Sequence, residues 1–470
     1  MKILKKPIIA CLTPVVLTCI FFLASCSQIH NGSIIITRSG IQQPGNTSDS
    51  PVAEQLALIN PDKPSEAPVV LTKDFFTARS PRVSYDGNNI LFEGRKTQND
   101  TWQIWEMNIN GSHLVQITSS PDNCTNPLYL PGNRIVFSKA SASNGPGTTQ
   151  SLFTCKPDGS DIRQITFSPY SYASSTILKD GRILFISKQK PEESSSSLMA
   201  LRPDGTKAEL FYFGAKGTFQ RGNAEETADN KIIFTESDSV SGNKTSLVSV
   251  NYNRPLHSRT VLSSGLSGDF KCALPWKDGK LLVSYRESES GNYSLYEFDP
   301  QLKSIGKPLF ENSGYDITGA VLAVASERPK KLPSEVDMGV KTGLLFCQDI
   351  NIHNDQAIDG KMAFNSSKRI EIIGMDSVMG IVNTEEDGSF YLKVIADTPF
   401  KIRTLDEKGN VISGPCDWVW VRPNERRGCV GCHEDHEIVP DNRRPLSVIK
   451  DPVSVPVHIN KVVEKKISLE

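Results

Sequence analysis

Two cysteines and a histidine stand close together near the end of this chain, in the order Cys429-Val430-Gly431-Cys432-His433. Two thiols at this spacing can each form a thioether with one vinyl group of the same porphyrin, and the histidine that follows is brought toward the iron. The C-x-x-C-H pattern therefore predicts one covalently attached haem c. Cys429 and Cys432 are the expected attachment residues, and His433 is the expected iron ligand.

Three other kinds of site use the same residue types. A structural zinc site usually separates its two ligand pairs by about twelve residues or more, whereas Cys429, Cys432, His433 and His436 lie within eight residues. A redox dithiol normally opens a helix in a thioredoxin-like unit, and the sequence shows no such unit. A simple disulfide between the two cysteines is the plainest alternative.

The first 26 residues have the features of an export signal that ends in a lipidation site. Three lysines precede an apolar stretch over residues 7–24, which is short for a membrane span. The tetrapeptide LASC, ending at Cys26, resembles the lipobox of bacterial lipoproteins. We expect cleavage before Cys26, its acylation and a position in the cell envelope, on the periplasmic face of the outer membrane because Ser27 rather than an aspartate follows. Haem thioethers form outside the cytoplasm, so the leader and the C-x-x-C-H motif both indicate an exported protein.

The net charge argues against a nucleic-acid partner, and the cysteine spacing argues against a disulfide framework. The formal net charge is −1, and removal of the three leader lysines makes it −4. No basic run indicates a nucleic-acid partner. Outside the leader, the lipidation site and the motif, five cysteines remain without the spacing of a disulfide framework, so we expect mostly buried thiols. These are Cys124, Cys155, Cys272, Cys347 and Cys416.

A repeated pattern of turn and strand fills the middle of the chain. It recurs in YDGNNILFEG, LPGNRIVFSK, KDGRILFISK, ADNKIIFTES and KDGKLLVSYR, whose turns are 45, 49, 49 and 49 residues apart. Asp-Gly pairs and their neighbours supply the positive φ of tight hairpins, and the flanking apolar residues alternate with period two. Four short strands per repeat of this length are typical of propeller blades. The turn residues are Gly87, Gly132, Gly181, Asn230 and Gly279.

The rhythm of these repeats resembles that of TolB-like six-bladed propellers. Five copies are clear, and a looser sixth blade can be built from residues 320–327 and 343–352, with 68–72 closing the ring. We predict an all-β chain, with a six-bladed propeller, a small β-sandwich-like domain and a short C-terminal haem c segment. The expected divisions are a signal peptide at 1–25, a flexible tether at 26–66, the propeller at 67–354, the small domain at 355–425 and the haem c segment with its tail at 426–470.

The region before the motif carries a second, sharper resemblance. The stretch DGSFYLKVIADTPFKIRTLDEKGNVI, then WVWVRPNERRGCVGCHEDHE, resembles the haem-binding region of proteins related to the hydrazine synthase alpha subunit. That family joins an N-terminal six-bladed propeller to a haem-binding domain. The resemblance implies that Cys429 and Cys432 attach haem. In the family's catalytic haem a tyrosine binds the iron and the motif histidine turns to zinc, so His433 carries over only as the motif histidine.

Residues just ahead of the motif are candidates for contact with the porphyrin. Trp418 and Trp420 alternate along one strand, and either could pack on the ring or belong to the core of the small domain. Arg422, Arg426 and Arg427 could pair with haem propionates or lie in a solvated loop.

Taken together, the residues predict an exported, lipid-anchored monohaem c-type protein that acts in electron transfer or haem-dependent redox work with a protein partner. One alternative is a propeller-based binding scaffold of the envelope with a structural or sensory haem. Another is a haem enzyme that acts on small nitrogen compounds. The chain holds one C-x-x-C-H where the alpha subunit has two, so the resemblance implies a one-haem relative rather than hydrazine synthesis itself.

Overall fold

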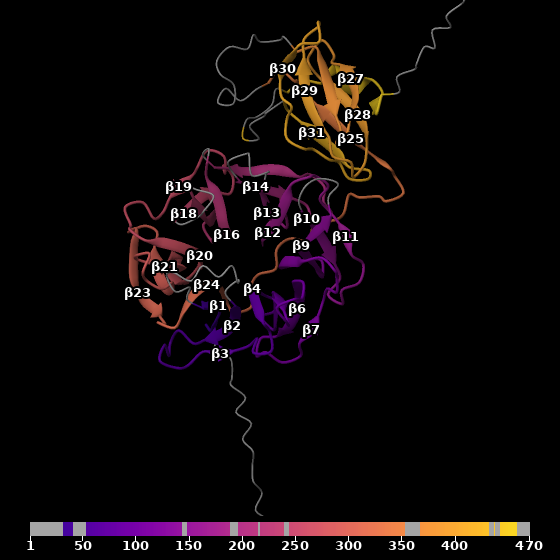
Figure 1. Ribbon diagram of the computed structural model, residues 1–470. Helices are drawn as coiled ribbons and strands as arrows, with labels where there is room; N and C mark the ends of the chain where they lie inside the picture. Colours follow the sequence, from indigo (N-terminus) through magenta and orange to yellow (C-terminus); the bar gives the residue numbers. More distant parts are fainter. Residues whose placement is uncertain are drawn as a thin grey trace, which may run out of the picture.

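The chain folds into a ring of sheets with a smaller β-domain beside it (Figure 1). The regular structure is almost entirely strand, and within the described ranges the helices are single 3₁₀ turns, η1 (Lys277–Gly279) and η2 (Leu446–Ile449). No helix in those ranges is long and apolar enough to cross a membrane. The computed structural model describes residues 32–40, 53–142, 148–188, 196–214, 217–238, 244–352, 367–431, 437 and 442–457.

Six four-stranded antiparallel sheets form the ring, and each sheet is one propeller blade. The six-bladed propeller predicted from the repeats is thereby confirmed. Blade I contains β24 (Tyr315–Leu322), β1 (Ile34–Gly40), β2 (Glu54–Ile59) and β3 (Val69–Val70). Blade II contains β4 (Thr77–Val83), β5 (Asn89–Arg95), β6 (Gln103–Asn108) and β7 (Val115–Gln116). Blade III contains β8 (Cys124–Leu130), β9 (Arg134–Ala142), β10 (Thr148–Cys155) and β11 (Arg163–Gln164).

The other three blades repeat the same order of strands, with the first strand of each nearest the axis of the ring. Blade IV contains β12 (Ser171–Ile177), β13 (Ile183–Lys188), β14 (Ser196–Leu201) and β15 (Glu209–Phe213). Blade V contains β16 (Phe219–Glu226), β17 (Lys231–Ser237), β18 (Thr245–Asn251) and β19 (Thr260–Val261). Blade VI contains β20 (Asp269–Pro275), β21 (Leu281–Arg286), β22 (Ser294–Asp299) and β23 (Ser304–Phe310).

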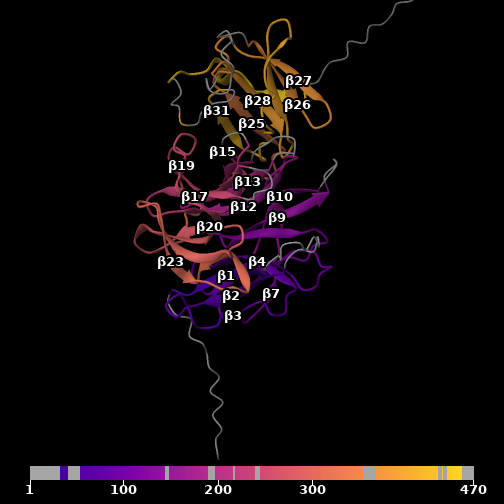
Figure 2. The ribbon, with the colours of Figure 1, turned by 60° about the vertical axis from the view of Figure 1, so that its left-hand side comes forward.

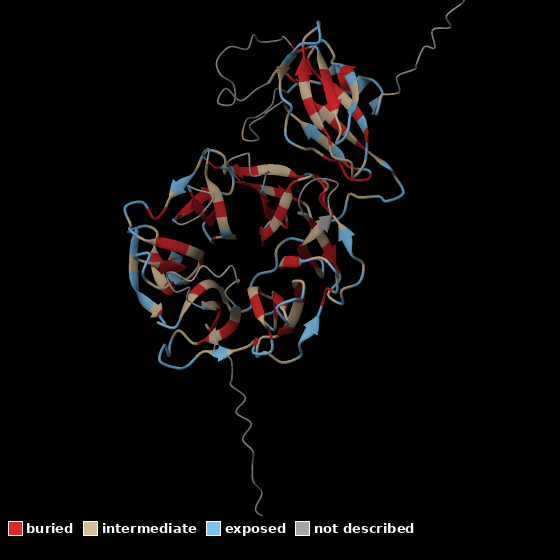
Figure 3. Cartoon of the chain, viewed as in Figure 1, coloured by how far each residue is buried: buried red, intermediate tan, exposed pale blue. Residues whose placement is uncertain are grey.

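In blades II, IV, V and VI the second strand is buried along almost its whole length. In β13 the first five residues are buried, and in β17 the last six are buried (Figure 3). Neighbouring blades pack on both faces of these strands, so a continuous apolar run suits them better than a strict alternation. The period-two pattern expected from the sequence therefore holds only in part.

The turns before these strands take the positive φ that the sequence predicted. Gly181 has a φ of +93°, and a side chain there would also collide with the carbonyl oxygen of Lys330. In blade III, however, Asn133 rather than Gly132 adopts positive φ, at +57°. Asparagine tolerates this conformation well. The hairpin turn therefore forms in blade III as well, but its residue with positive φ is Asn133, one position after the predicted Gly132.

The ring closes through the N-terminal part of the chain. Strand β1 pairs antiparallel with β24, Ile34 opposite Leu322 and Gly40 opposite Tyr315. Residues 34–40 and 54–59 are thus strands of blade I, and the tether predicted at 26–66 is wrong over these residues. The Ser- and Pro-rich surroundings hid two short apolar runs, IIIT and QLALI, that are buried between blades.

A long extended segment leaves β24 and crosses one face of the propeller toward the small domain. Ser326 N donates to Tyr85 O, and Lys330 N donates to Lys179 O, each at 3.0 Å. Farther on, Arg202 donates to the carbonyl oxygen of Pro333. This segment therefore lies over hairpin turns of blades II and IV before the second domain begins.

The small domain is a β-sandwich of two four-stranded sheets (Figure 2). It begins with β25, which the sequence reading assigned to the last blade, and it ends with β32, so the expected boundaries at 354 and 426 are both wrong. Two strands from the expected haem segment join the edges of the first sheet, each in parallel. The first sheet has the order β31 (Arg426–Cys429), β25 (Thr342–Cys347), β28 (Phe390–Ile395) and β32 (Val453–Val455). The second has the order β27 (Val378–Asn383), β26 (Arg369–Ile373), β29 (Lys401–Leu405) and β30 (Val411–Ser413).

Replacement of Ile35 by alanine tests whether β1 belongs to the propeller. Ile35 is fully buried in the core between blades I and II, so Ile35→Ala is expected to lower the free energy of unfolding by about 2–5 kcal/mol in urea titrations. The control Val115→Ala lies on an outer strand and is half exposed, and it should change the value by less than about 0.5 kcal/mol. Equal, negligible effects would mean that this stretch is a tether after all.

Candidate functional site

The first cysteine of the motif ends a strand at the edge of the sandwich. Cys429 is the last residue of β31, which pairs in parallel with β25 so that Cys429 lies opposite Cys347. Its side chain is half-buried and packs at the rim of the sandwich core. The motif thus starts at the end of a paired strand.

Backbone bonds continue beyond β31 and fix the start of the motif loop, which we define as residues 430–442. Gln348 N donates to Cys429 O at 2.9 Å, and Asp349 N donates to Val430 O at 3.1 Å. Gly431 is buried, and a Cβ at this position would collide with the carbonyl oxygen of Ile352. The glycine between the two motif cysteines is therefore required by close packing of the backbone.

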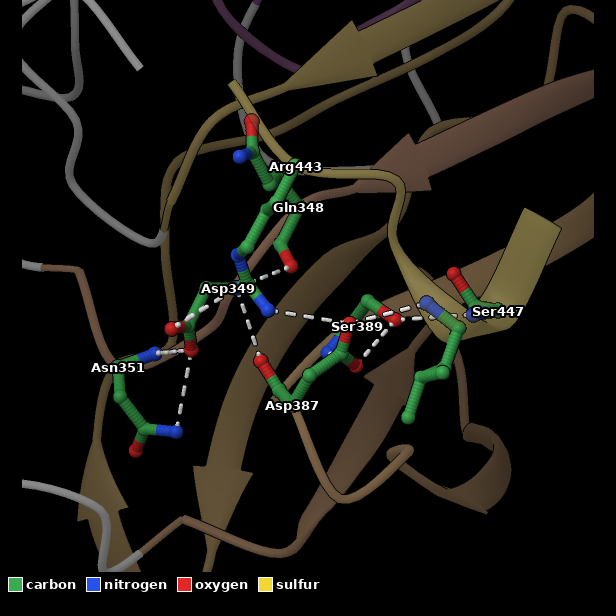
Figure 4. Close-up of polar contacts among 8 residues, drawn as sticks. Gln348, Asp349, Asn351, Asp387, Ser389, Arg443 and Ser447 are labelled. Carbon is green, nitrogen blue, oxygen red and sulfur yellow. Dashed lines mark hydrogen bonds and ion pairs between the residues drawn. The ribbon is translucent and has the colours of Figure 1, made fainter. Parts of the chain in front are cut away.

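The end of the motif loop returns to the same place. The guanidinium of Arg443 donates to Gln348 O at 3.2 Å and to Asp387 O at 3.0 Å, and it forms ion pairs with Asp349 at 3.3 Å and Asp387 at 3.1 Å (Figure 4). Next to it, Leu446 N donates to the Asp387 carboxylate at 2.9 Å. Gln348 and Asp349 thus bind both ends of the loop and form its neck.

The ionised carboxylate of Asp387 stabilises this neck. Burial alone would raise the pKa of Asp387, but hydrogen bonds from Ser389 and from the Leu446 amide, together with the charge of Arg443, hold the pKa of this carboxyl below its usual range. Asp387 therefore stays ionised at neutral pH and keeps its bonds to the returning chain. Sequence reasoning missed this residue because its DGS turn looks like any other hairpin.

One residue in the middle of the loop reaches the propeller. Glu437 accepts hydrogen bonds from Leu256 N at 2.9 Å and from Arg254 Nε at 3.1 Å, and its side chain is only 8% exposed. Both partners lie in the turn between β18 and β19 of blade V. Cys432, His433 and His436 fall outside the described residues, as does Cys26 in the predicted leader.

The segment ahead of the motif joins the sandwich to the propeller. Trp420 is 3% exposed and lies in the core between blades III and IV, with its ring 6.2 Å from that of Tyr172. Trp418 packs against the same cluster. The two candidate roles of Trp420, contact with the porphyrin and membership of the small-domain core, are therefore both wrong.

The arginines near this segment also bind the propeller. Arg422 donates to Asp204 O at 3.1 Å, pairs with Asp397 at 2.7 Å and stacks on Phe167. Arg427 donates to Ala208 O. These two guanidinium groups are engaged between the domains and do not lie in a solvated loop. Arg426 is exposed.

Glu425 adds a further interdomain contact. Its carboxylate accepts hydrogen bonds from Lys207 N and Arg422 N, both at 2.7 Å. Burial raises the pKa of this carboxyl, against the lowering effect of those bonds. The sandwich is thus held on the propeller by Trp420, which is buried in the propeller core, and by the polar contacts around it.

The remaining described cysteines behave as structural thiols. Burial raises the pKa of Cys155 to about 12 and that of Cys272 to about 11. Cys416 lies near the motif, yet burial also raises its pKa to about 11, and its sulfur accepts a hydrogen bond from Ile402 N. A protonated, packed thiol is a poor nucleophile, so these residues do not compete for the chemistry of the motif.

Comparison with known proteins places these features in one family context. Residues 347–434 match the family model of the hydrazine synthase alpha subunit middle domain. The hydrazine synthase subunit alpha of Kuenenia stuttgartiensis is 22% identical over 494 aligned residues, which cover 77% of this chain and 61% of that protein. The chain is related to the hydrazine synthase alpha subunit. It spans about three fifths of the length of that curated relative.

One solved structure shares the fold of most of this chain. The structure of Kuenenia stuttgartiensis hydrazine synthase superposes with a TM-score of 0.78 at 20% identity, covering 89% of this chain and 72% of the other. TolB from Acinetobacter baumannii gives a lower TM-score of 0.45 at 16% identity, over 62% of this chain and 67% of its own.

A haem attached through Cys429 would need an accessible thiol, and the described residues offer one. The half-buried thiol stands at a sheet edge, and the adjacent Gly428 is exposed and presents no side chain. Phe346 lies beside Gly428 and forms an edge-to-face pair with Tyr391, with ring centroids 6.5 Å apart. Within the described ranges no three histidine, cysteine or acidic side chains gather as a metal site.

Exchange of the motif glycine tests the rigid start of the loop. Gly431→Ala is expected to push the loop away from Ile352, which would speed amide hydrogen exchange at Gln348 and Asp349 and lower the yield of covalent haem several-fold. The matched variant Gly428→Ala places its Cβ 3.6 Å from Phe346, an ordinary contact, and should leave both readouts unchanged. Equal behaviour of the two variants would contradict the packing argument.

Proposed function

We propose that this chain is an exported, lipid-anchored protein that carries one covalent haem c and works in electron transfer or in haem-dependent redox chemistry with a protein partner. The observation that carries the proposal is the C-x-x-C-H loop, held at both ends by Gln348 and Asp349 and in its middle by Glu437. The curated relative's name, hydrazine synthase subunit alpha, supports an assembly with other proteins.

The role of the protein in this proposal is to hold the attachment groups still. Cys429 and Cys432 would carry the two thioethers and His433 would face the iron, which supplies one-electron chemistry when haem is bound. The neck at Asp349 fixes the backbone next to Cys429, and Glu437 is held by blade V. A redox centre on a well-supported backbone needs less rearrangement when its charge changes, and the support at Cys429 favours electron transfer in this proposal.

An enzymatic role on small nitrogen compounds is the second candidate, and only the name of the curated relative supports it. The two roles differ in the coordination of the iron. A haem with two protein ligands and no response to added carbon monoxide would support electron transfer. A haem that binds carbon monoxide would support catalysis or sensing.

The attachment residues can be tested directly. After expression with a cytochrome c maturation system, the full chain should retain haem through denaturation and show a reduced c-type spectrum, whereas Cys429→Ala and Cys432→Ala should each lose one thioether, with a shifted pyridine haemochrome band. Cys416→Ala, which removes a partly buried thiol near the motif, is the matched control and should keep both thioethers. A wild-type protein without covalent haem would refute the proposal.

The proposed anchor has its own test. Cys26→Ala should move the protein from the membrane fraction to the periplasmic fraction in a double-membraned host, because one cysteine carries all the acyl chains. Ser27→Ala is the control and should leave the protein in the membrane fraction. Retention of Cys26→Ala in the membrane would show that another element holds the protein there.

A further inference from the structure

A cavity of about 680 Å³ lies where the extended segment passes blade III on its way to the sandwich. Three parts of the chain form its walls. They are strand ends and turns of blades III and IV, residues 331–338 of the extended segment, and the side chains of Asp397 and Arg422 beside the sandwich. None of the described residues that hold the motif loop lines this cavity. It is therefore separate from the candidate haem site.

Apolar side chains form much of the wall. Leu130, Ile165 and Phe167 belong to blade III, and the first two are only 4% and 2% exposed. Leu332 and Val336 of the extended segment contribute to the wall from the other side. The cavity thus offers a hydrocarbon surface built from two separate parts of the chain.

Two large apolar side chains of the wall are open to water. Ile162, in the turn before β11, is 54% exposed, and Met338, near the end of the extended segment, is 58% exposed. Single exposed apolar side chains are ordinary on a protein surface, but these two line the same cavity. An apolar group bound there would shield both from water, which favours binding.

Several polar groups of the wall already have protein partners. Arg422 pairs with Asp397 at 2.7 Å and stacks on Phe167. The carboxylate of Asp204 accepts a hydrogen bond from Glu335 N at 2.7 Å. These contacts hold the extended segment and the sandwich against blade IV, so these groups need no ligand.

Positive charge exceeds negative charge around the cavity, since four basic and two acidic side chains line it. Arg134 and Arg163 both bind the carboxylate of Asp161, at 2.7 and 2.8 Å, so two guanidinium groups share one negative charge. Lys331 is exposed, and within the part of the chain that the structure describes its ammonium forms no hydrogen bond or ion pair. Its Cε lies 3.7 Å from the place of a Cβ on Gly132. The lysine therefore lies over the turn of blade III with its charge open.

We propose that this cavity binds a small apolar carboxylate, an aromatic or branched aliphatic acid, with its hydrocarbon part between Phe167 and Val336 and its carboxylate at Lys331. The volume is in the range of small-molecule sites, which are mostly apolar with a few polar groups that fix the orientation. The apolar wall favours the hydrocarbon, and the open ammonium favours an anionic head group over a neutral or a cationic one.

The test is titration calorimetry of the full chain at low ionic strength, with 4-phenylbutanoate and its uncharged amide as matched probes. We expect 4-phenylbutanoate to bind with a Kd of about 1 mM or tighter. The amide should bind about threefold more weakly, because it lacks the charge that meets Lys331. In Lys331→Met the two probes should bind equally.

Hydrogen exchange locates the bound probe. Val336 N donates to Ser334 Oγ at 3.2 Å, and Asp337 N donates to Pro423 O at 3.2 Å. Both amides are expected to exchange more slowly with 4-phenylbutanoate present. Val336→Asp places a like charge on the apolar wall and should weaken 4-phenylbutanoate at least about tenfold, while thermal unfolding checks that this variant folds.

The control is Lys307→Met, which removes the same charge from the exposed outer strand β23 and should keep the preference for the carboxylate. Failure of both probes to bind, or a preference for the carboxylate that persists in Lys331→Met, would overturn the proposal. Slower exchange only at amides away from the extended segment would also overturn it. Covalent haem does not enter these readouts, so the outcome is independent of the proposed haem function.

Discussion

The docking of the sandwich on the propeller is the constraint on which the candidate site depends. The sandwich holds residues 430, 431 and 443, and blade V holds Glu437, so the positions of these residues depend on the relative placement of the two domains. Trp420 fixes that placement, because its buried ring fills the core between blades III and IV. Arg422 and Glu425 form directional hydrogen bonds to blade IV, and these bonds oppose rotation of the sandwich about Trp420.

The sequence predicted the propeller because its turns repeat. The residues around Gly181 and Gly279 combine a positive φ with a following apolar strand, and such local signals survive without knowledge of the whole fold. The closing strand β1 was missed because its only partner for ring closure, β24, is nearly 300 residues away. Local composition cannot reveal a pairing between residues so far apart in the chain.

The chemistry of the candidate site could be predicted from the sequence, but the residues that hold its backbone in place could not. The C-x-x-C-H spacing points to Cys429 directly, since the pattern is contiguous. The neck residues Gln348 and Asp349 lie some 80 residues earlier, and Arg443 resembles any basic residue of a polar tail. Trp420 was misplaced because a tryptophan that alternates along a strand looks the same whether it faces its own domain or another one.

The early start of β1 changes how far the protein could stand from a membrane. With a lipid on Cys26 and the propeller beginning at Ile34, only eight peptide steps separate them, which span at most about 28 Å when fully extended. The tether expected to run to residue 66 would have allowed about 140 Å by the same measure. If Cys26 carries the proposed lipid, so short a linker would keep the propeller close to the lipid surface, and its partners would have to meet it there.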